Sequence, residues 1–135
     1  MLGEELYVRI ARLHRLVSTD VGAGPSVAQA RTLGRLLADG PQRISALALA
    51  ERTAQPSMTA LIDRMEKAGW VERGPDPTDG RAVTVSLTAS GAAEVAAVRI
   101  ASGRAMEERL SALSDEHRTA LQAALPALDA LLAAT

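Results

Sequence analysis

Residues 55–91 read QPSMTALIDRMEKAGWVERGPDPTDGRAVTVSLTASG, and this stretch decides the fold. An early proline, an apolar i, i+3, i+4, i+7 spacing and a glycine after Lys67 predict a helix over residues 56–68. Alternating apolar residues on both sides of a Gly/Pro/Asp-rich segment predict two strands joined as a hairpin. A further helix is expected to begin after Thr88, its N-cap. The order helix, strand, loop, strand, helix therefore frames the interpretation of the whole chain.

The predicted helix has one apolar face and one face of short polar side chains. The apolar positions are Met58, Leu61, Ile62 and Met65. Small residues near the N-terminus let a helix approach a major groove, where hydroxyls bond phosphates or base edges and a methyl group contacts thymine. The candidate DNA-binding residues on this face are Gln55, Pro56, Ser57, Thr59, Ala60 and Arg64. The alternative is an ordinary amphipathic surface helix. Asp63 lies on the same face, where it either accepts from cytosine N4 or pairs with Arg64 or Lys67.

The hairpin places an arginine where a duplex could be reached. Its inward-facing positions are expected to be Val71 and Arg73 on the first strand and Val83, Val85 and Leu87 on the second. Asp79-Gly80 predicts a tight turn in which glycine takes a positive φ. Arg81 then lies at or near the tip, and an arginine there can enter a narrow minor groove. Asp79 is expected to orient it; Asp76 and Asp79 either bond loop amides or hold the Arg81 guanidinium. The alternative is a solvated loop arginine.

These motifs together resemble the MarR (multiple antibiotic resistance regulator) family of winged helix-turn-helix regulators. The resemblance rests on GWVER at residues 69–73, on the pattern D-P-x-D-x-R at residues 76–81, and on L-T-x-x-G at residues 87–91. It extends over nearly the whole chain and is strongest over residues 40–91. The resemblance implies a mainly α fold with a small β-hairpin wing (α+β), and it makes the helix at 56–68 the recognition helix.

Further helices are expected on both sides of this stretch. The predicted ranges are 3–19, 26–39, 45–53, 88–110 and 114 to the chain end, with N-caps at Ser26, Ser45, Thr88 and Ser114 and a very short strand at 43–44. The inner face of the second helix is expected at Val27, Ala30, Leu33 and Leu37, and that of the third at Leu47, Leu49 and Ala50. Pro126 should kink the last helix or shift its start.

The terminal helices carry more apolar surface than a small winged domain can cover. Leu2, Leu6, Ile10, Leu13 and Val17 follow one face of the first helix, and Leu121, Leu125, Leu128 and Leu132 follow one face of the last. We therefore predict a homodimer, which the resemblance also implies. The expected organisation is one MarR-like domain over residues 1–135, with dimerisation helices at 1–20 and 89–135 and a winged helix-turn-helix DNA-binding lobe at 26–88. A monomeric helical bundle is the alternative.

Composition excludes several other classes of protein. The chain has no cysteine, so disulfides, thiolate metal sites and cysteine redox switches are excluded. No signal peptide, lipidation motif or apolar run of about 20 residues is evident, so we expect a cytoplasmic protein without membrane contact. The net charge of −1 argues mildly against DNA binding, which depends on phosphate neutralisation. The prediction therefore depends on where the charges point.

Few residues suggest chemistry. The two histidines, His14 and His117, lie far apart in sequence, and no catalytic or phosphate-binding motif accompanies them. We expect no catalytic residue, no metal site and no cofactor. The resemblance implies a small-molecule effector bound between the dimerisation helices and the winged lobe. Tyr7 and His14, with Arg9 or Arg12, are the weak candidates for that site, and core-edge or interface roles are their alternative.

The sequence thus predicts a homodimeric, sequence-specific DNA-binding transcription regulator, most simply a ligand-responsive repressor. Its expected partner is double-stranded DNA with a pseudo-palindromic operator. Two other functions stay open: a winged-helix protein-interaction module without specific DNA binding, and a small enzyme. Strong salt dependence of duplex binding would separate the first of these from a regulator.

Overall fold

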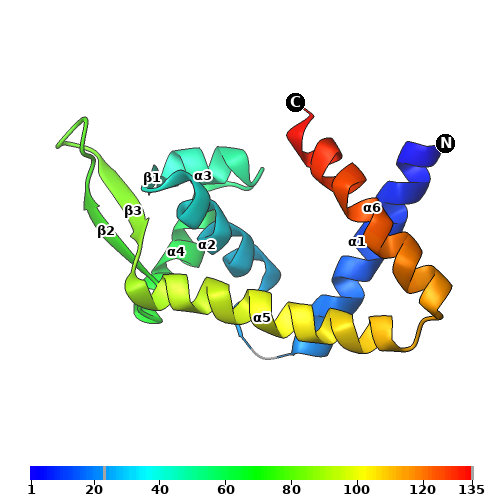
Figure 1. Cartoon of the computed structure of the whole chain (residues 1–135). Helices are drawn as coiled ribbons and strands as arrows, with labels where there is room; N and C mark the ends of the chain where they lie inside the picture. Colours follow the sequence, from blue (N-terminus) through cyan, green and yellow to red (C-terminus); the bar gives the residue numbers. More distant parts are fainter. Residues whose placement is uncertain (23, 135) are drawn as a thin grey trace.

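Figure 1 traces the chain in the computed structural model, which describes residues 1–22 and 24–134. The elements follow in the order α1 (Leu2–Val21), α2 (Val27–Asp39), β1 (Gln42–Arg43), α3 (Ile44–Ala50), α4 (Gln55–Lys67), β2 (Val71–Pro75), β3 (Val83–Leu87), α5 (Ala89–Ser111) and α6 (Asp115–Ala133). Helices α2–α4 and the sheet form a lobe at one end of α5, and α1 and α6 lie at the other end. The mainly helical class with a small hairpin is as predicted, and each expected element is present within a few residues.

The sheet is antiparallel, with β3 in the centre between β1 and β2. The β2–β3 register pairs Val71 with Leu87 and Pro75 with Val83. The prediction that Val83 faces the core is wrong, because its side chain is 52% exposed whereas Thr84 is buried. Val83 pairs at the loop end of the hairpin, while Thr84 has a neighbouring strand on each side. Apolar alternation therefore does not describe this central strand.

Helix α4 packs its apolar face into the core of the lobe. Met58, Leu61, Ile62 and Met65 are all buried, as the sequence predicted. The helix ends in a Schellman motif: Gly69 has φ 82°, its amide donates to the Glu66 carbonyl, and the Trp70 amide donates to the Met65 carbonyl. The remaining core residues are Leu33, Leu36, Leu47, Ala48, Val71 and Val85. This packing fixes which face of α4 is left outward.

The inner faces of α2 and α3 differ from those predicted. Helix α2 buries Leu33 and Leu36 as well as Thr32, whose hydroxyl donates to the Ala28 carbonyl at 2.9 Å, so that burial leaves this polar group satisfied. Val27 and Leu37 are about half exposed. Helix α3 buries Leu47 and Ala48 and leaves Leu49 82% exposed. Its N-cap is Arg43 rather than Ser45, because Ile44 already has helical hydrogen bonding, and the helix ends at Ala50 rather than near Thr53.

The predicted caps of the other helices are present. Ser26 and Gln29 form the reciprocal capping box of α2, with bonds of 3.2 and 2.9 Å. Thr88 caps α5 through the Gly91 amide, and Ser114 caps α6 through the His117 amide. Helix α6 begins at Asp115 and is continuous through Pro126, so the prediction of a shifted start is wrong.

The terminal helices bury little within one chain. Val17 is the one buried residue of α1 in the described chain, and no described residue of α6 is buried. Ion pairs join these helices at their surface: Arg109 of α5 contacts Asp20 of α1 at 2.8 Å, and Arg118 of α6 contacts Glu107 of α5 at 3.0 Å. The apolar stripes of α1 and α6 consequently remain largely exposed on the chain.

Candidate nucleic-acid interface

The outward face of α4 carries the candidate major-groove residues. Gln55, Pro56, Ser57, Ala60 and Arg64 are exposed, and Thr59 is half-buried. The Thr59 hydroxyl donates to the Gln55 carbonyl at 3.0 Å, so only its oxygen lone pairs are left for an incoming donor. The other polar groups on this face point outward beside one another and can meet a duplex directly.

Asp63 is already occupied by a residue that the sequence did not suggest. Its carboxylate pairs with Arg73 of β2 at 2.6 Å, so the prediction of a pair with Arg64 or Lys67 is wrong. Arg73 also contacts Glu66 at 2.7 Å. The hydrogen bond that the Arg73 guanidinium donates to Asp63 is the largest cause that raises the pKa of Arg73 above its ordinary value. The signal was present in the sequence, because strand parity places Arg73 on the same side as Val71, facing the helix.

The hairpin projects from the lobe as a wing whose base lies beside the start of α5 and whose tip lies far from that helix (Figure 1). Its loop closes with the Asp76 amide donating to the Ala82 carbonyl and the Ala82 amide donating to the Asp79 carbonyl, both at 3.0 Å. Gly80 does not have a positive φ, so the predicted type of turn is wrong. The loop is longer than a two-residue turn, and its side chains bond its own amides instead. Asp79 accepts the Arg81 amide at 3.1 Å.

Asp76 ties the base of the wing to the body of the lobe. One carboxylate oxygen accepts the Thr78 amide and hydroxyl at 2.8 Å each, and the other accepts from Arg43 Nε at 2.8 Å. These bonds, the Thr78 amide first, lower the pKa of Asp76 well below its usual range. Arg43 also lies 4.0 Å from Asp79. Both wing carboxylates are therefore engaged by loop amides and by Arg43, which sequence reasoning missed because Arg43 lies 33 residues away.

Arg81 is exposed, and its guanidinium makes no ion pair with any described residue. Asp79 holds its backbone, whereas its side chain is left to solvent. This arrangement leaves a positive charge at the outer part of a fixed hairpin, which is the geometry that insertion into a minor groove requires.

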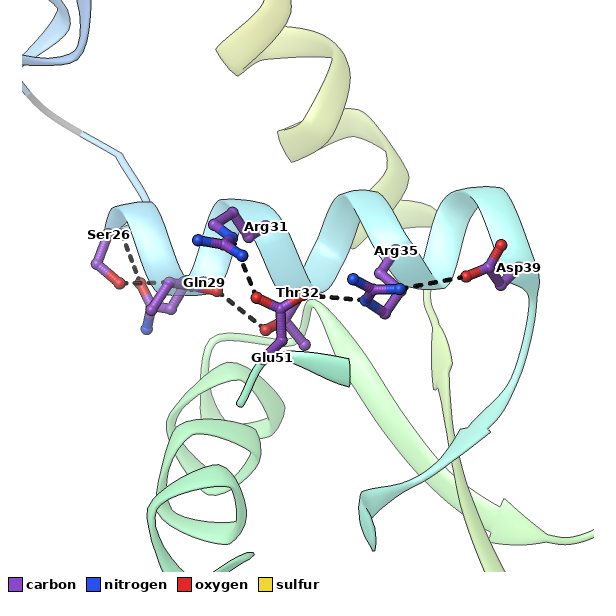
Figure 2. A network of polar contacts seen from close by, with 8 residues as sticks. Ser26, Gln29, Arg31, Thr32, Arg35, Asp39 and Glu51 are labelled. Carbon is purple, nitrogen blue, oxygen red and sulfur yellow. Dashed lines mark hydrogen bonds and ion pairs between the residues drawn. The ribbon is translucent and has the colours of Figure 1, made fainter. Parts of the chain in front are cut away.

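A second polar network joins α2 to the turn between α3 and α4. Glu51, whose side chain is only 11% exposed, accepts from Arg31 Nε and Arg35 Nε at 3.0 Å each, and Arg35 lies 3.8 Å from Asp39 (Figure 2). Figure 2 shows Glu51 below α2, between the two arginines. The next residue, Arg52, has φ 52°, a left-handed conformation that is costly for a residue with a Cβ. The network holds this strained turn, and with it the N-terminus of α4, against α2.

The structure separates the weak effector candidates. His14 lines a cleft of ≈ 270 Å³ between α1, α2 and α5, together with Ser18, Arg31 and Ser102. Tyr7 is 74% exposed and lies elsewhere on α1, where Arg9 pairs with Glu5 at 3.1 Å. In the part of the chain that the structure describes, no group of three or more His, Cys, Asp or Glu side chains is arranged to hold a metal ion.

A helix-turn-helix formed by α3 and α4, followed by a wing with an exposed arginine, defines a winged helix-turn-helix DNA-binding protein. The MarR family model matches residues 26–83. An HTH-type transcriptional regulator of Mycobacterium bovis is 36% identical over 132 residues, covering 97% of this chain and 92% of the relative. The chain belongs to the MarR family and is a DNA-binding transcription regulator, a class of protein without enzymatic activity.

Solved structures support the same assignment. A putative transcriptional regulator from Pseudomonas aeruginosa has a TM-score of 0.79 at 27% identity, covering 97% of this chain and 93% of that one. The apo form of Escherichia coli MarR has a TM-score of 0.74 at 25% identity, covering 95% and 96%. Regulators of this family bind DNA and act as dimers. Among the described residues, no helix has the length and apolarity needed to cross a membrane.

Proposed function

We propose that the protein is a homodimeric, ligand-responsive repressor that binds a pseudo-palindromic operator in the cytoplasm. Residues 26–88 would form its DNA-binding lobe, and residues 1–20 and 89–135 its dimerisation helices. The observation that carries this proposal is the division of the exposed surface. The candidate DNA-binding side chains lie on α4 and the wing, whereas exposed leucines lie on α1 and α6 at the far end of α5.

The apolar faces support the dimer. Leu121 and Leu125 are about half exposed, and Leu13, Met106 and Leu110 join them around a groove of ≈ 500 Å³. Exposed apolar surface that runs over several helices usually marks an interface. A second copy of the same chain presents the same stripes and would cover them about a two-fold axis.

Each half of the dimer would contact one half-site. The N-terminal part of α4, with Ser57, Thr59 and Ala60, would enter the major groove, while Arg64 would contact a base or phosphate. Arg81 would enter the adjacent minor groove. The positions of the charges matter more than their sum, because several carboxylates of the lobe are paired with arginines: Asp63 and Glu66 with Arg73, Asp76 with Arg43, and Glu51 with two arginines.

The cleft between α1, α2 and α5 is the proposed effector site. His14 and Arg31 are its cationic or titratable lining groups, so a small anion fits its chemistry. A ligand that favours another arrangement of α1 and α5 would change the spacing of the two lobes and release DNA. Operator selection with and without a metabolite extract tests whether such an effector exists.

The decisive experiment is selection of bound duplexes from random DNA, followed by footprinting. Because two recognition helices related by a two-fold axis must enter successive major grooves, half-site centres should lie about 10 bp apart, or a multiple of this. Inserting about 5 bp should reduce affinity toward the non-specific value, and about 10 bp should restore it only in part. Equal binding to all three spacings, or failure to select any sequence, would contradict the proposal; weak dependence on salt would favour a protein-interaction module.

A further inference from the structure

Arg73 of β2 makes direct side-chain contact with the recognition helix α4. Its guanidinium spans two carboxylates of α4, with Nη2 2.6 Å from Asp63 Oδ1 and Nη1 2.7 Å from Glu66 Oε1. The two acids are three residues apart, so they lie on one face of the helix. A forked, planar cation suits this pair because each nitrogen meets a separate oxygen.

The location of Arg73 lets these ion pairs hold helix α4 and strand β2 relative to each other. Helix α4 and strand β2 are joined by the short turn at Gly69, whose left-handed φ of 82° redirects the chain. Arg73 lies two residues along β2 from the buried Val71 and leads outward toward the loop. The turn and the burial of Val71 in the same core as the apolar face of α4 join helix and strand at one end, and the Arg73 ion pairs join them again further along, toward the loop. The ion pairs therefore hold the part of β2 beyond Val71 against α4.

The same ion pairs alter the charge that helix α4 presents to DNA. Asp63 and Glu66 are about half exposed, with side-chain accessibilities of 53% and 42%, on the helix expected in the groove. Carboxylates near phosphates oppose binding to any sequence. Arg73 neutralises one of these two charges in net terms, so a purely electrostatic role and a positioning role both predict weaker binding when Arg73 is lost. The two roles must be separated by variants that change charge and geometry in opposite senses.

We propose that Arg73 is a positioning residue that holds α4 and the wing as one rigid DNA-binding unit, the rigid reader. Arg73 therefore determines sequence specificity more than total DNA affinity. The inference rests on the proposed function, since it assumes that α4 and Arg81 contact one duplex together. When α4 and the wing are held rigidly, binding of one places the other at its groove without a further loss of conformational entropy. When they are flexible, the second element must still be ordered after the first has bound.

The test compares two kinds of variant on the duplex selected by the wild-type protein and on a scrambled duplex. Arg73→Ala removes the positive charge and the ion pairs. Asp63→Asn with Glu66→Gln removes the same ion pairs but makes the lobe more positive. Arg73→Lys keeps the charge without the fork, and Arg104→Ala, an exposed arginine of α5, is the charge-matched control. Thermal unfolding of each variant checks that the lobe is folded.

The expected signature is a fall in the ratio of specific to non-specific affinity for both kinds of variant. Arg73→Ala should lose about tenfold in specific affinity, with a much smaller change on scrambled DNA. The amide double variant should bind scrambled DNA more tightly than wild type, yet show a reduced ratio. Arg73→Lys should recover only part of the loss, and Arg104→Ala should keep the wild-type ratio. If the amide double variant instead binds the selected duplex more tightly with an unchanged ratio, Arg73 acts by charge alone and the positioning role is wrong.

A double-mutant cycle with Arg81→Ala gives a readout that a merely stabilising role would not move. When the reader is rigid, removing Arg81 from the wild type loses the full minor-groove contact. When Arg73 is absent, that contact is already partly lost, so the fold-loss from Arg81→Ala should be smaller. An equal fold-loss in both backgrounds would overturn the inference while leaving the regulator intact. Failure of the wild type to select any sequence would instead remove the proposed function itself, and the role of Arg73 with it.

Discussion

Replacing Gly91 with alanine should destabilise the protein through a clash that the structure defines. Gly91 lies in the first turn of α5, against the turn that follows the recognition helix. A Cβ at this position would lie 2.0 Å from the Trp70 carbonyl oxygen, 2.9 Å from its carbonyl carbon and 2.8 Å from Leu87 Cδ1. The leucine methyl group can move, but the carbonyl is part of the backbone.

The Trp70 carbonyl cannot withdraw without loss of other bonds. It accepts the Thr88 amide at 3.0 Å, and the Thr88 hydroxyl donates to the Gly69 carbonyl at 2.6 Å. Overpacking and the weakening of these bonds together should cost about 3–4 kcal/mol. Alanine gains about 1 kcal/mol over glycine inside a helix. The net loss in the free energy of unfolding should therefore be about 2–3 kcal/mol.

Gly103 supplies the matched control, because it lies in the same helix. Among the described residues, a Cβ at Gly103 meets no atom of a neighbouring element within 4 Å. Gly103→Ala should therefore stabilise by up to about 1 kcal/mol. Urea unfolding followed by circular dichroism measures both changes, at one protein concentration, because the stability of a dimer depends on concentration. If Gly91→Ala unfolds at the same urea concentration as wild type, the close approach of α5 to this turn is not a constraint and the reasoning is refuted.

Three further substitutions separate DNA reading from folding. Arg81→Ala should weaken operator binding by about 1–3 kcal/mol without changing the melting temperature, and wild-type affinity in a titration would exclude the wing contact. Asp76→Asn should be less stable than wild type above about pH 4. Because the folded-state pKa of Asp76 is lowered, this difference in stability should shrink as the pH falls below that value. A difference in urea midpoints that does not depend on pH would contradict the bonds to Thr78 and Arg43. Arg52→Gly should stabilise by about 1 kcal/mol, because φ 52° strains arginine but not glycine, and an unchanged melting temperature would argue against that strain.

Local patterns predicted the elements that depend on local physics. The apolar spacing of α4 identified all four of its buried residues, and Ser26, Thr88 and Ser114 were each recognised as N-caps. These features depend on residues no more than a few positions apart, so sequence spacing alone contains the information. Ser45 is not the N-cap of α3, because the helix begins one residue earlier, at Ile44, directly after the short strand β1.

Features that depend on contacts between distant residues could not be predicted in the same way. The pairing of Arg43 with Asp76 joins positions 33 residues apart, and burial of Thr84 depends on the presence of a strand on each side of β3. The stripes of α1 and α6 were recognised as apolar, yet their periodicity indicates only that these faces should be buried against another surface. It does not state whether that cover comes from the same chain or from a second copy.

The D-P-x-D-x-R pattern shows why a motif and a site are different things. Four of its residues were identified from sequence; Arg81 was assigned to DNA binding, and Asp76 and Asp79 were expected either to bond loop amides or to hold the Arg81 guanidinium. In the structure, Asp76 and Asp79 accept from loop amides and lie beside Arg43, whereas the Arg81 guanidinium makes no ion pair with any described residue. Substitutions within one motif should therefore divide into two kinds, those at Asp76 lowering stability and those at Arg81 lowering DNA affinity. Resemblance cannot make that distinction, because it records which residues recur and not which way they face.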